Sequence, residues 1–248
     1  MRDLQRMPIA MALAEHTTKA FDCDLQDLAR MVAEMGGLAE RQIVEAIEAL
    51  TRRNTERAGR VIAADAAIDS LQRSIEQRAV ETIARRQPMA IDLREVVGVL
   101  RISNELERIG DLAKNIGKRV IALDGGDISR RSMRGVRHMA SLALAQLQDV
   151  LDSFARRDPT RAAAVRARDE EVDRMYTSMF RELITYMFED PGTITAGIHL
   201  LFCTKNIERM GDHTINIADT VQYMIDGYAP PSEPIQAVDR ERLPLAVE

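Results

Sequence analysis

The chain has 248 residues, of which 46% are hydrophobic but only 4% aromatic, and this composition is typical of long helices that pack on one another. Its formal net charge is −5, and its basic residues occur singly or in pairs, which disfavours general nucleic-acid binding. No apolar stretch approaches 18 residues, so we expect no membrane-spanning segment and no cleaved signal peptide. Cys23 and Cys203 form no metal-binding or disulfide pattern, and we therefore expect a cytoplasmic protein.

Helical periodicity predicts three long helices in the first half of the chain. The first runs from about Phe21 to Thr51 and is followed by the polar break RRNTE. The second ends near Arg86, because the Gln-Pro dipeptide that follows interrupts a helix. The third begins near Asp92, with an acid at its positive end, and reaches about Leu123 before the sequence DGGD breaks the chain.

The second half of the chain repeats this arrangement. A fourth helix fits residues from about Ser129 to Ala155, and RRDP then reproduces the earlier break with a proline in the first turn of the next helix. A fifth helix is expected to end near Glu189, before the sequence DPG, and a sixth near Asp226. The chain is therefore predicted to contain two copies of one three-helix unit.

Fixed offsets between the halves support an internal repeat. On the second helix of each unit, Asp65 recurs as Asp169, 104 positions later. On the third helix, Glu107 recurs as Glu208, 101 positions later, because the second Pro-containing loop is shorter. We predict an all-α fold of two tandem antiparallel three-helix bundles, with the first repeat at 17–125, the second at 126–227 and a flexible Pro-rich tail at 228–248.

Each predicted bundle carries two pairs of acids spaced four residues apart. This spacing puts both acids of a pair on one face of a helix, where like charges repel. In the first unit the two pairs can lie level, because Asp69 and Glu107 are each 19 residues from Pro88. The corresponding counts in the second unit are 18 and 17. The eight acids are Asp65, Asp69, Glu107 and Asp111 in the first unit, and Asp169, Asp173, Glu208 and Asp212 in the second.

Four carboxylates that converge on one patch repel one another unless they are protonated or bridged by a cation. Oxygen ligands without cysteine suit Mg²⁺, Mn²⁺ or Fe, so the pattern predicts one metal site in each repeat. His213 could add a nitrogen ligand beside the second site only. Gly110 and Gly211 lie between the acids, and they indicate either a closely packed neighbouring helix or clearance for a bound ion.

Two alternatives remain open on these residues. The acids can be solvated and paired with neighbouring basic residues such as Lys114, in which case the protein is a metal-free helical scaffold. A metal-dependent hydrolase on a helical bundle is the other alternative. Against catalysis, no histidine follows a glutamate at the Glu-x-x-His spacing, and nucleophile and nucleotide-binding motifs are absent from the sequence. We therefore expect no catalytic residues.

Several segments of the chain have a recognisable pattern. They are the two acidic motifs ERIGD and ERMGD, their partners DAAID and DEEVD, the loop IARRQPMAIDLR and the segment LITYMFED. Together they resemble the PhoU family of phosphate-uptake regulators. The resemblance extends from about Phe21 to Tyr228. It implies two three-helix bundles, commonly in a homodimer, and a metal cluster held by the acids of each repeat. Iron, zinc, manganese and magnesium are all compatible with such ligands.

The resemblance also implies a function. Such a protein is a cytoplasmic negative regulator that docks on the phosphate-sensing histidine kinase and on the ATPase subunit of the phosphate ABC transporter. It would reach the inner face of the membrane through these partners, without inserting into the membrane itself. Lys114 corresponds to Ile215, and Asn104 to Lys205, so we expect the two metal sites to differ in metal number or affinity.

Overall fold

The computed structural model describes the backbone of residues 9–123 and 129–227, and the side chains of 21–123 and 129–227 except that of residue 169. All regular elements within these residues are helices, as the composition predicted. Their bounds are α1 Ile9–Arg52, α2 Thr55–Arg86, α3 Ile91–Ala122, α4 Arg130–Arg156, α5 Pro159–Ala167, α6 Asp169–Glu189, the 3₁₀ turn η1 Pro191–Thr193, and α7 Ile194–Asp226. The predicted tail at 228–248 lies outside the described residues.

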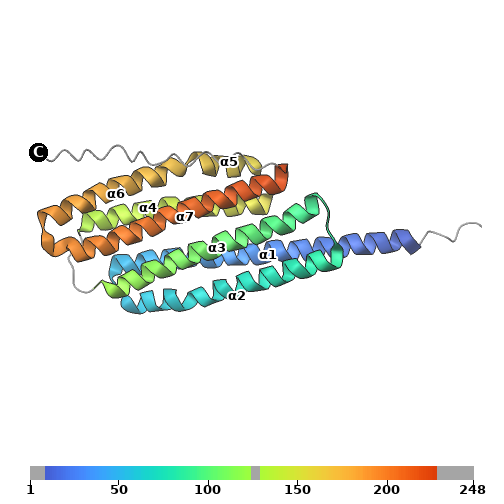
Figure 1. Cartoon of the computed structure of the whole chain (residues 1–248), viewed down its shortest axis with the longest axis horizontal. Coiled ribbons are helices and arrows are strands. Elements are labelled where there is room, and N and C mark those ends of the chain that lie inside the picture. The colour runs from blue at the N-terminus through green and yellow to red at the C-terminus, as the bar shows by residue number, and fades with distance from the viewer. Residues whose placement is uncertain (1–8, 124–128, 228–248) are drawn as a thin grey trace, which may run out of the picture.

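Two antiparallel bundles lie side by side along their length (Figure 1). Helices α1, α2 and α3 form the first bundle, and α4 to α7 form the second. Helices α3 and α7 run antiparallel at the junction and make the most extensive helix–helix contact among the described residues. The α2–α3 connection consequently lies at the opposite end of the molecule from the α6–α7 connection (Figure 1). The predicted fold class is confirmed.

The breaks between the helices repeat at the predicted positions. Asn54 caps α2, with its Oδ1 accepting a hydrogen bond from the backbone N–H of Arg57 at 2.8 Å. Asp158 caps α5 in the same way, 104 positions later. The preceding residues, Arg53 and Arg157, adopt left-handed backbone angles with φ of 51° and 54°. Local sequence therefore ends and restarts the helices identically in both repeats.

The fifth predicted helix is interrupted, which the sequence did not indicate. Helix α5 ends at Ala167 and α6 begins at Asp169, so the break lies at Arg168. The carbonyl oxygen of Arg168 accepts a hydrogen bond from Nε2 of Gln146, on α4, at 3.0 Å. A side chain from a neighbouring helix thus satisfies the carbonyl at the break, and the interruption depends on tertiary packing. The first helix also differs from its prediction, because α1 begins at Ile9 rather than near Phe21.

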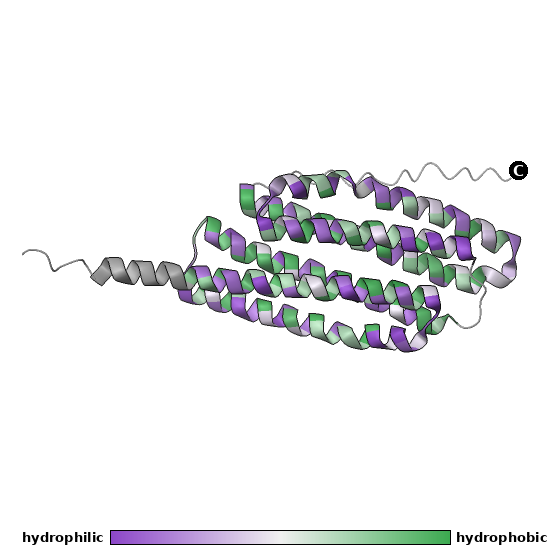
Figure 2. Cartoon of the chain, turned by 180° about the vertical axis from the view of Figure 1, so that it is seen from behind, coloured by the Kyte–Doolittle hydropathy of each residue, from purple (hydrophilic) through white to green (hydrophobic). Residues whose placement is uncertain are grey.

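The core is continuous across the two bundles. One cluster of buried hydrophobic side chains contains residues from all seven α helices. Ile102, Leu106 and Ile109 of α3 are fully buried, as are Leu200 and Ile207 of α7. Hydrophobic and hydrophilic residues alternate around each helix (Figure 2), which is the pattern of helices with one face in a core. No helix of the described residues is long and apolar enough to span a membrane.

The two cysteines differ sharply in environment, and we expect thiol chemistry to separate them. Cys203 is fully buried in α7, and burial raises its pKa to about 12, whereas Cys23 is exposed. Because the thiolate is the reactive species, Ellman's reagent should titrate one thiol rapidly in the native protein and the second only in denaturant. Cys23→Ser should remove the rapid phase alone. Two rapid phases in the wild type would contradict the burial of Cys203.

Candidate functional site

The first repeat brings its predicted acids together, but it places a lysine among them. Asp65 of α2 is buried, and its Oδ2 accepts a hydrogen bond from Nζ of Lys114 at 2.5 Å. The same ammonium donates to Oδ1 of Asp111 at 2.8 Å, within α3. Oδ1 of Asp65 accepts from Nε2 of Gln42, on α1, at 3.2 Å. Hydrogen bonds to Asp111 and Asp65 raise the pKa of Lys114 above its ordinary value, so the ammonium stays charged.

The other two acids of this repeat lie beside the ion pair. Burial raises the pKa of Glu107, and the nearby charges of Asp111, Asp69 and Asp65 raise it further. Arg108 offsets part of this repulsion, with its Nε 3.6 Å from Oε2 of Glu107. The four acids of the first unit therefore share one surface patch, as predicted, and a basic side chain already compensates part of their charge.

The second repeat has Ile215 at the position of Lys114, and three of its acids lie close together. One carboxylate oxygen each from Asp173, Glu208 and Asp212 lies within 4.8 Å of the others. Burial raises the pKa values of Asp173 and Glu208, and the charge of Asp212 adds to both shifts. The ammonium of Lys205 contacts Glu208 at 2.5 and 2.6 Å, but from a half-exposed side chain one turn away. The side chain of Asp169, predicted to be the fourth acid, lies outside the described residues.

The two sites differ in how well they suit a metal ion. Metal–oxygen distances of about 2.0–2.6 Å place ligand oxygens on opposite sides of one ion about 4–5 Å apart. The oxygens of Asp173, Glu208 and Asp212 meet this condition, so these three residues could hold a hard or borderline cation. In the first repeat both oxygens of Asp65 already have hydrogen-bond partners within the protein. The three acids of the second repeat thus meet the distance condition for one ion, whereas in the first repeat the ammonium of Lys114 lies between two of the acids.

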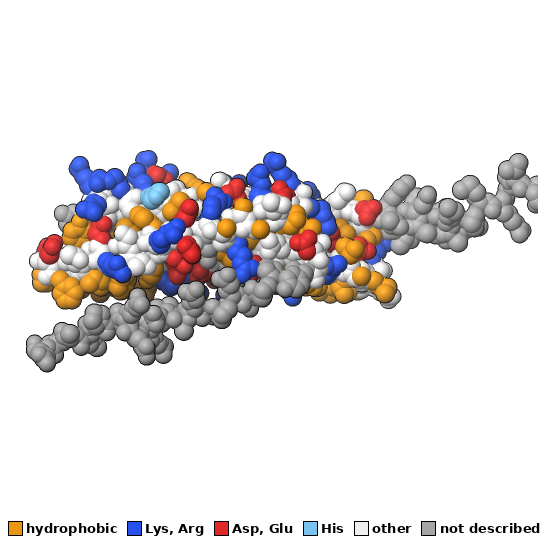
Figure 3. All heavy atoms as spheres, turned by 90° about the horizontal axis from the view of Figure 1, so that it is seen from above, with side chains coloured by type: hydrophobic (Ala, Val, Ile, Leu, Met, Phe, Trp, Pro, Cys, Tyr) orange, Lys and Arg blue, Asp and Glu red, His pale blue; other side chains and the backbone are white. Residues whose placement is uncertain are grey.

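The charges on one face of the molecule are mixed. Figure 3 shows basic and acidic side chains interspersed over the face that it presents. A cation would therefore be attracted by the local acidic cluster rather than by the field of a wholly acidic face.

His213 does not lie where the sequence suggested. Its Nδ1 is 2.7 Å from Oε2 of Glu105, and Asn216 donates to the same oxygen at 3.0 Å. Glu105 belongs to α3, so these hydrogen bonds join the two repeats across the α3–α7 junction. Hydrogen bonds from His213 and Asn216 lower the pKa of Glu105 despite its burial. Sequence reasoning missed this contact because no local spacing reveals which residues of two antiparallel helices lie opposite each other.

The two glycines between the acids have different surroundings. A Cβ on Gly110 would lie 2.9 Å from Cδ1 of Ile68 and 3.2 Å from Oε1 of Gln42, so close packing accounts for this glycine. A Cβ on Gly211 would meet nothing nearer than Cγ1 of Val172, at an ordinary 3.6 Å. Close packing, one of the two explanations offered by the sequence, therefore holds for the first repeat only.

These surroundings predict opposite effects of the same substitution. Gly110→Ala should lower the free energy of unfolding by about 1 kcal/mol, because overpacking outweighs the gain in helix propensity. Gly211→Ala should raise it by about 1 kcal/mol, because the gain in propensity is unopposed. Urea unfolding of both variants in EDTA, followed by circular dichroism, measures the difference. Changes of the same sign in the free energy of unfolding would contradict the difference in packing around the two glycines.

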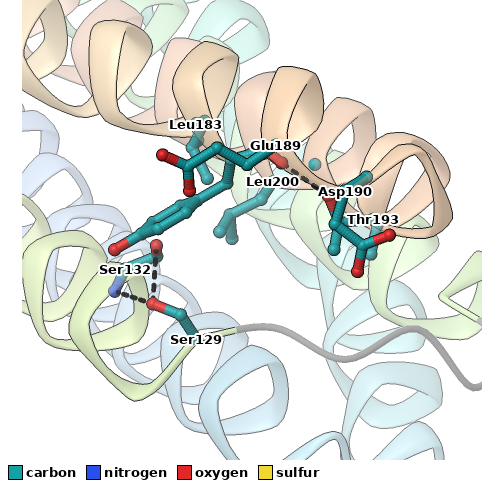
Figure 4. A pocket seen from close by; sticks show the side chains of 10 residues that line it. Ser129, Ser132, Leu183, Glu189, Asp190, Thr193 and Leu200 are labelled. Atoms are coloured by element: carbon teal, nitrogen blue, oxygen red, sulfur yellow. Dashed lines mark hydrogen bonds between the residues drawn. The ribbon is translucent and has the colours of Figure 1, made fainter.

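A separate cavity of about 260 Å³ lies at the end of the second bundle (Figure 4). It is lined by Ser129 and Ser132 at the start of α4 and by residues of the α6–α7 connection, including Asp190 and Thr193. Ser129 caps α4 by accepting a hydrogen bond from the backbone N–H of Ser132 at 3.1 Å. Glu208 is 15 residues beyond Thr193 on α7, about 22 Å along the helix, so this cavity is not part of the carboxylate site.

Comparisons with known proteins agree along most of the chain. The family model described as the PhoU domain matches twice, at residues 32–120 and 136–221. A protein of Rhizobium meliloti named phosphate-specific transport system accessory protein PhoU homolog is 52% identical, over 88% of this chain and 92% of its own length. A protein of the same name from Caulobacter vibrioides is 47% identical, over 87% of this chain and 94% of its own length.

Solved structures agree as well. The crystal structure of PhoU from Pseudomonas aeruginosa superposes with a TM-score of 0.80 at 38% identity, covering 84% of this chain and all of that one. The phosphate transport system regulatory protein PhoU from Streptococcus pneumoniae gives a TM-score of 0.79 at 28% identity, covering 85% of this chain and 99% of its own. Sequence and fold thus point to the same family.

Proposed function

The chain belongs to the PhoU family, and from this premise we propose that it is a negative regulator of the phosphate-starvation response and of high-affinity phosphate uptake. It acts by docking to a phosphate-sensing histidine kinase and to the ATPase subunit of a phosphate ABC transporter. The observation that carries the proposal is the similarity of both repeats to accessory proteins of phosphate-specific transport, over almost the full length of those proteins.

Exposed apolar side chains support action by docking. Met89, in the α2–α3 connection, is 80% exposed, and Phe188, near the end of α6, is 84% exposed. They occur at corresponding ends of the two repeats, and these ends lie at opposite ends of the molecule (Figure 1). Phe and Met are among the residue types enriched in protein–protein interfaces. We propose that they contact the kinase and the transporter, and that the protein works in the cytoplasm as a homodimer.

We further propose that the acids of the second repeat hold a divalent or trivalent metal ion. Asp173, Glu208 and Asp212 would be its ligands, and iron, zinc, manganese and magnesium all accept such oxygens. A bound cation would neutralise these carboxylates and hold α6 against α7, which are otherwise pushed apart by like charges at this point. The role proposed for the metal is therefore to stiffen the second bundle as a docking surface.

A reporter of phosphate-starvation genes tests the regulatory assignment. In phosphate-rich medium, cells lacking their own copy of this gene should express the reporter, and the wild-type chain should restore repression. Variants carrying Met89→Ser and Phe188→Ser together should restore it poorly at equal folded protein levels. Val80→Ser, at an exposed position within α2, is the matched control and should repress like wild type. Failure of the wild-type chain to repress would refute the proposed function.

A second comparison in the same cells addresses the metal. Glu208→Gln together with Asp212→Asn keeps the shape of the site and removes its charge. Loss of repression with this variant would tie the acidic cluster to regulation. Full repression would leave the regulatory assignment standing and favour the metal-free helical scaffold, which thermal unfolding with and without EDTA would then examine independently.

A further inference from the structure

The two carboxylate sites differ in the position of a lysine, because Lys205 of the second repeat replaces Asn104 of the first, and Lys114 of the first has no basic counterpart in the second. Lys114 of the first repeat corresponds to Ile215 of the second, at the same offset of 101 that relates Glu107 to Glu208. The acids around these two positions are otherwise of the same types in both repeats. The lysine of the first site thus follows Asp111 on α3, whereas the lysine of the second site precedes Glu208 on α7.

The ammonium of Lys114 lies where a bridging cation would be needed. Nζ is 2.5 Å from Asp65 on α2 and 2.8 Å from Asp111 on α3, both distances of charge-assisted hydrogen bonds. The ammonium therefore joins α2 and α3 through one carboxylate oxygen of Asp65 and one of Asp111. The remaining oxygen of Asp65 accepts from Gln42, so a metal would have to share each oxygen of this carboxylate with an existing donor.

Burial makes it unfavourable for a metal ion to displace the ammonium of Lys114 from the two carboxylates. The side chain of Asp65 is only 4% exposed and that of Lys114 is 25% exposed. An incoming metal would have to displace the ammonium from both carboxylates and leave it beside the new positive charge. Removing one partner of a buried ion pair is strongly unfavourable, because the remaining charge loses its compensation. The tethered ammonium also competes as an intramolecular group, which needs no binding from solution.

The second site has a weaker internal competitor, because its lysine pairs with one acid, Glu208, rather than bridging two acids. Gln146, the counterpart of Gln42, donates to the backbone of Arg168 at 3.0 Å. Lys205 reaches Glu208 from the preceding turn of the same helix, and its side chain is 46% exposed. A pair between residues three apart on one helix, with a half-exposed lysine, should open more readily than the bridge that Lys114 makes between α2 and α3. The oxygens of the three acids remain within reach of one ion.

We propose that Lys114 is a built-in cation that takes the place of a metal in the first repeat, so that this chain binds metal only at Asp173, Glu208 and Asp212 of the second. This inference rests on the metal binding proposed above and is independent of the regulatory assignment. It follows that the first bundle keeps its acidic helices together in the presence of chelators, whereas the second bundle depends on its ion.

Metal content tests the proposal. Purified protein is equilibrated with Mn²⁺ and freed of excess metal, and the bound metal per chain is measured by inductively coupled plasma mass spectrometry. Isothermal titration calorimetry with Mn²⁺ measures the affinity in parallel. Glu107→Gln with Asp111→Asn should leave the metal content of the wild type unchanged. Glu208→Gln with Asp212→Asn should lower Mn²⁺ affinity by about tenfold or more. These two variants change the same residue types at equivalent positions, so each is the control of the other.

Replacement of the lysine provides the converse test. Lys114→Ile, which copies the second repeat, should create an additional class of Mn²⁺ site that is absent from the wild type. Lys118→Ile is the control, because Lys118 lies one turn further along α3 and contacts Asn115 rather than the acids. The new site should disappear again when Glu107→Gln and Asp111→Asn are added. Circular dichroism of each variant establishes that it is folded before metal is added.

Three results would overturn the proposal. The first is a comparable loss of metal from both amide variants, which would mean that both repeats bind metal in the wild type. The second is folded Lys114→Ile protein that gains no Mn²⁺ site, and the third is wild-type protein that binds no metal at all. None of these outcomes would affect the reporter assay of the wild-type chain, so failure of this inference is distinguishable from failure of the proposed function.

Discussion

Lys114→Met is expected to lower the free energy of unfolding of the metal-free protein by about 2 kcal/mol. The substitution keeps the length of the side chain but removes its charge, which leaves Asp65 buried without its ammonium partner. Loss of a partner from a fully buried pair costs more than this, about 3–5 kcal/mol, and partial exposure of Lys114 reduces the effect. Urea unfolding in EDTA, monitored by circular dichroism, measures the change.

Two further variants show whether the lost ion pair is the cause. Lys118→Met removes a lysine from the exposed side of the same helix and should change stability by no more than about 0.5 kcal/mol. Adding Asp65→Asn to Lys114→Met should recover part of the loss, because no buried charge then remains. Equal losses for Lys114→Met and Lys118→Met would contradict the structural role given to Lys114.

Ile102→Ala should destabilise the protein by about 3 kcal/mol, the larger of the two effects. Ile102 is fully buried in α3, the helix that packs against α1 and α2 as well as against α7. Truncation removes buried apolar surface and leaves a cavity that rigid long helices can close only partly. The free energy of unfolding from urea titrations of wild type and variant measures the loss.

Ile121→Ala provides the matched control, since Ile121 lies on the same helix and is 49% exposed. It should cost less than about 1 kcal/mol. Because the core is continuous across both bundles, Ile102→Ala should also shift a single unfolding transition rather than split it into two. Separate transitions for the two bundles would show that the shared core does not couple them.

Local sequence determined much of this fold. The capping residues Asn54 and Asp158 and the offset of 104 between them predict where the second and fifth helices begin, and both predictions are confirmed. The interruption at Arg168 was not predictable, because the carbonyl there is satisfied by Gln146 from another helix. The start of α1 at Ile9 also differs from the prediction, which has this helix begin near Phe21.

The positions of the acidic patches could also be predicted from the sequence. Spacing of four residues puts Glu107 with Asp111 and Glu208 with Asp212 on one helix face. Equal or nearly equal distances from the loops bring the acids of the two helices level. These relations follow from the geometry of a helix and of a hairpin of helices. The sequence by itself therefore determined the all-α class, the repeat and the location of both acidic patches.

Only the tertiary structure decided what compensates the acids. Whether Lys114 points to solvent or between α2 and α3 depends on how each helix is rotated about its axis, and the packing of the core sets that rotation. The pairing of His213 with Glu105 likewise depends on the register of α3 against α7. Residues on different helices meet through contacts distributed over the whole core, so no local pattern records them, and two nearly identical motifs acquire different surroundings for this reason.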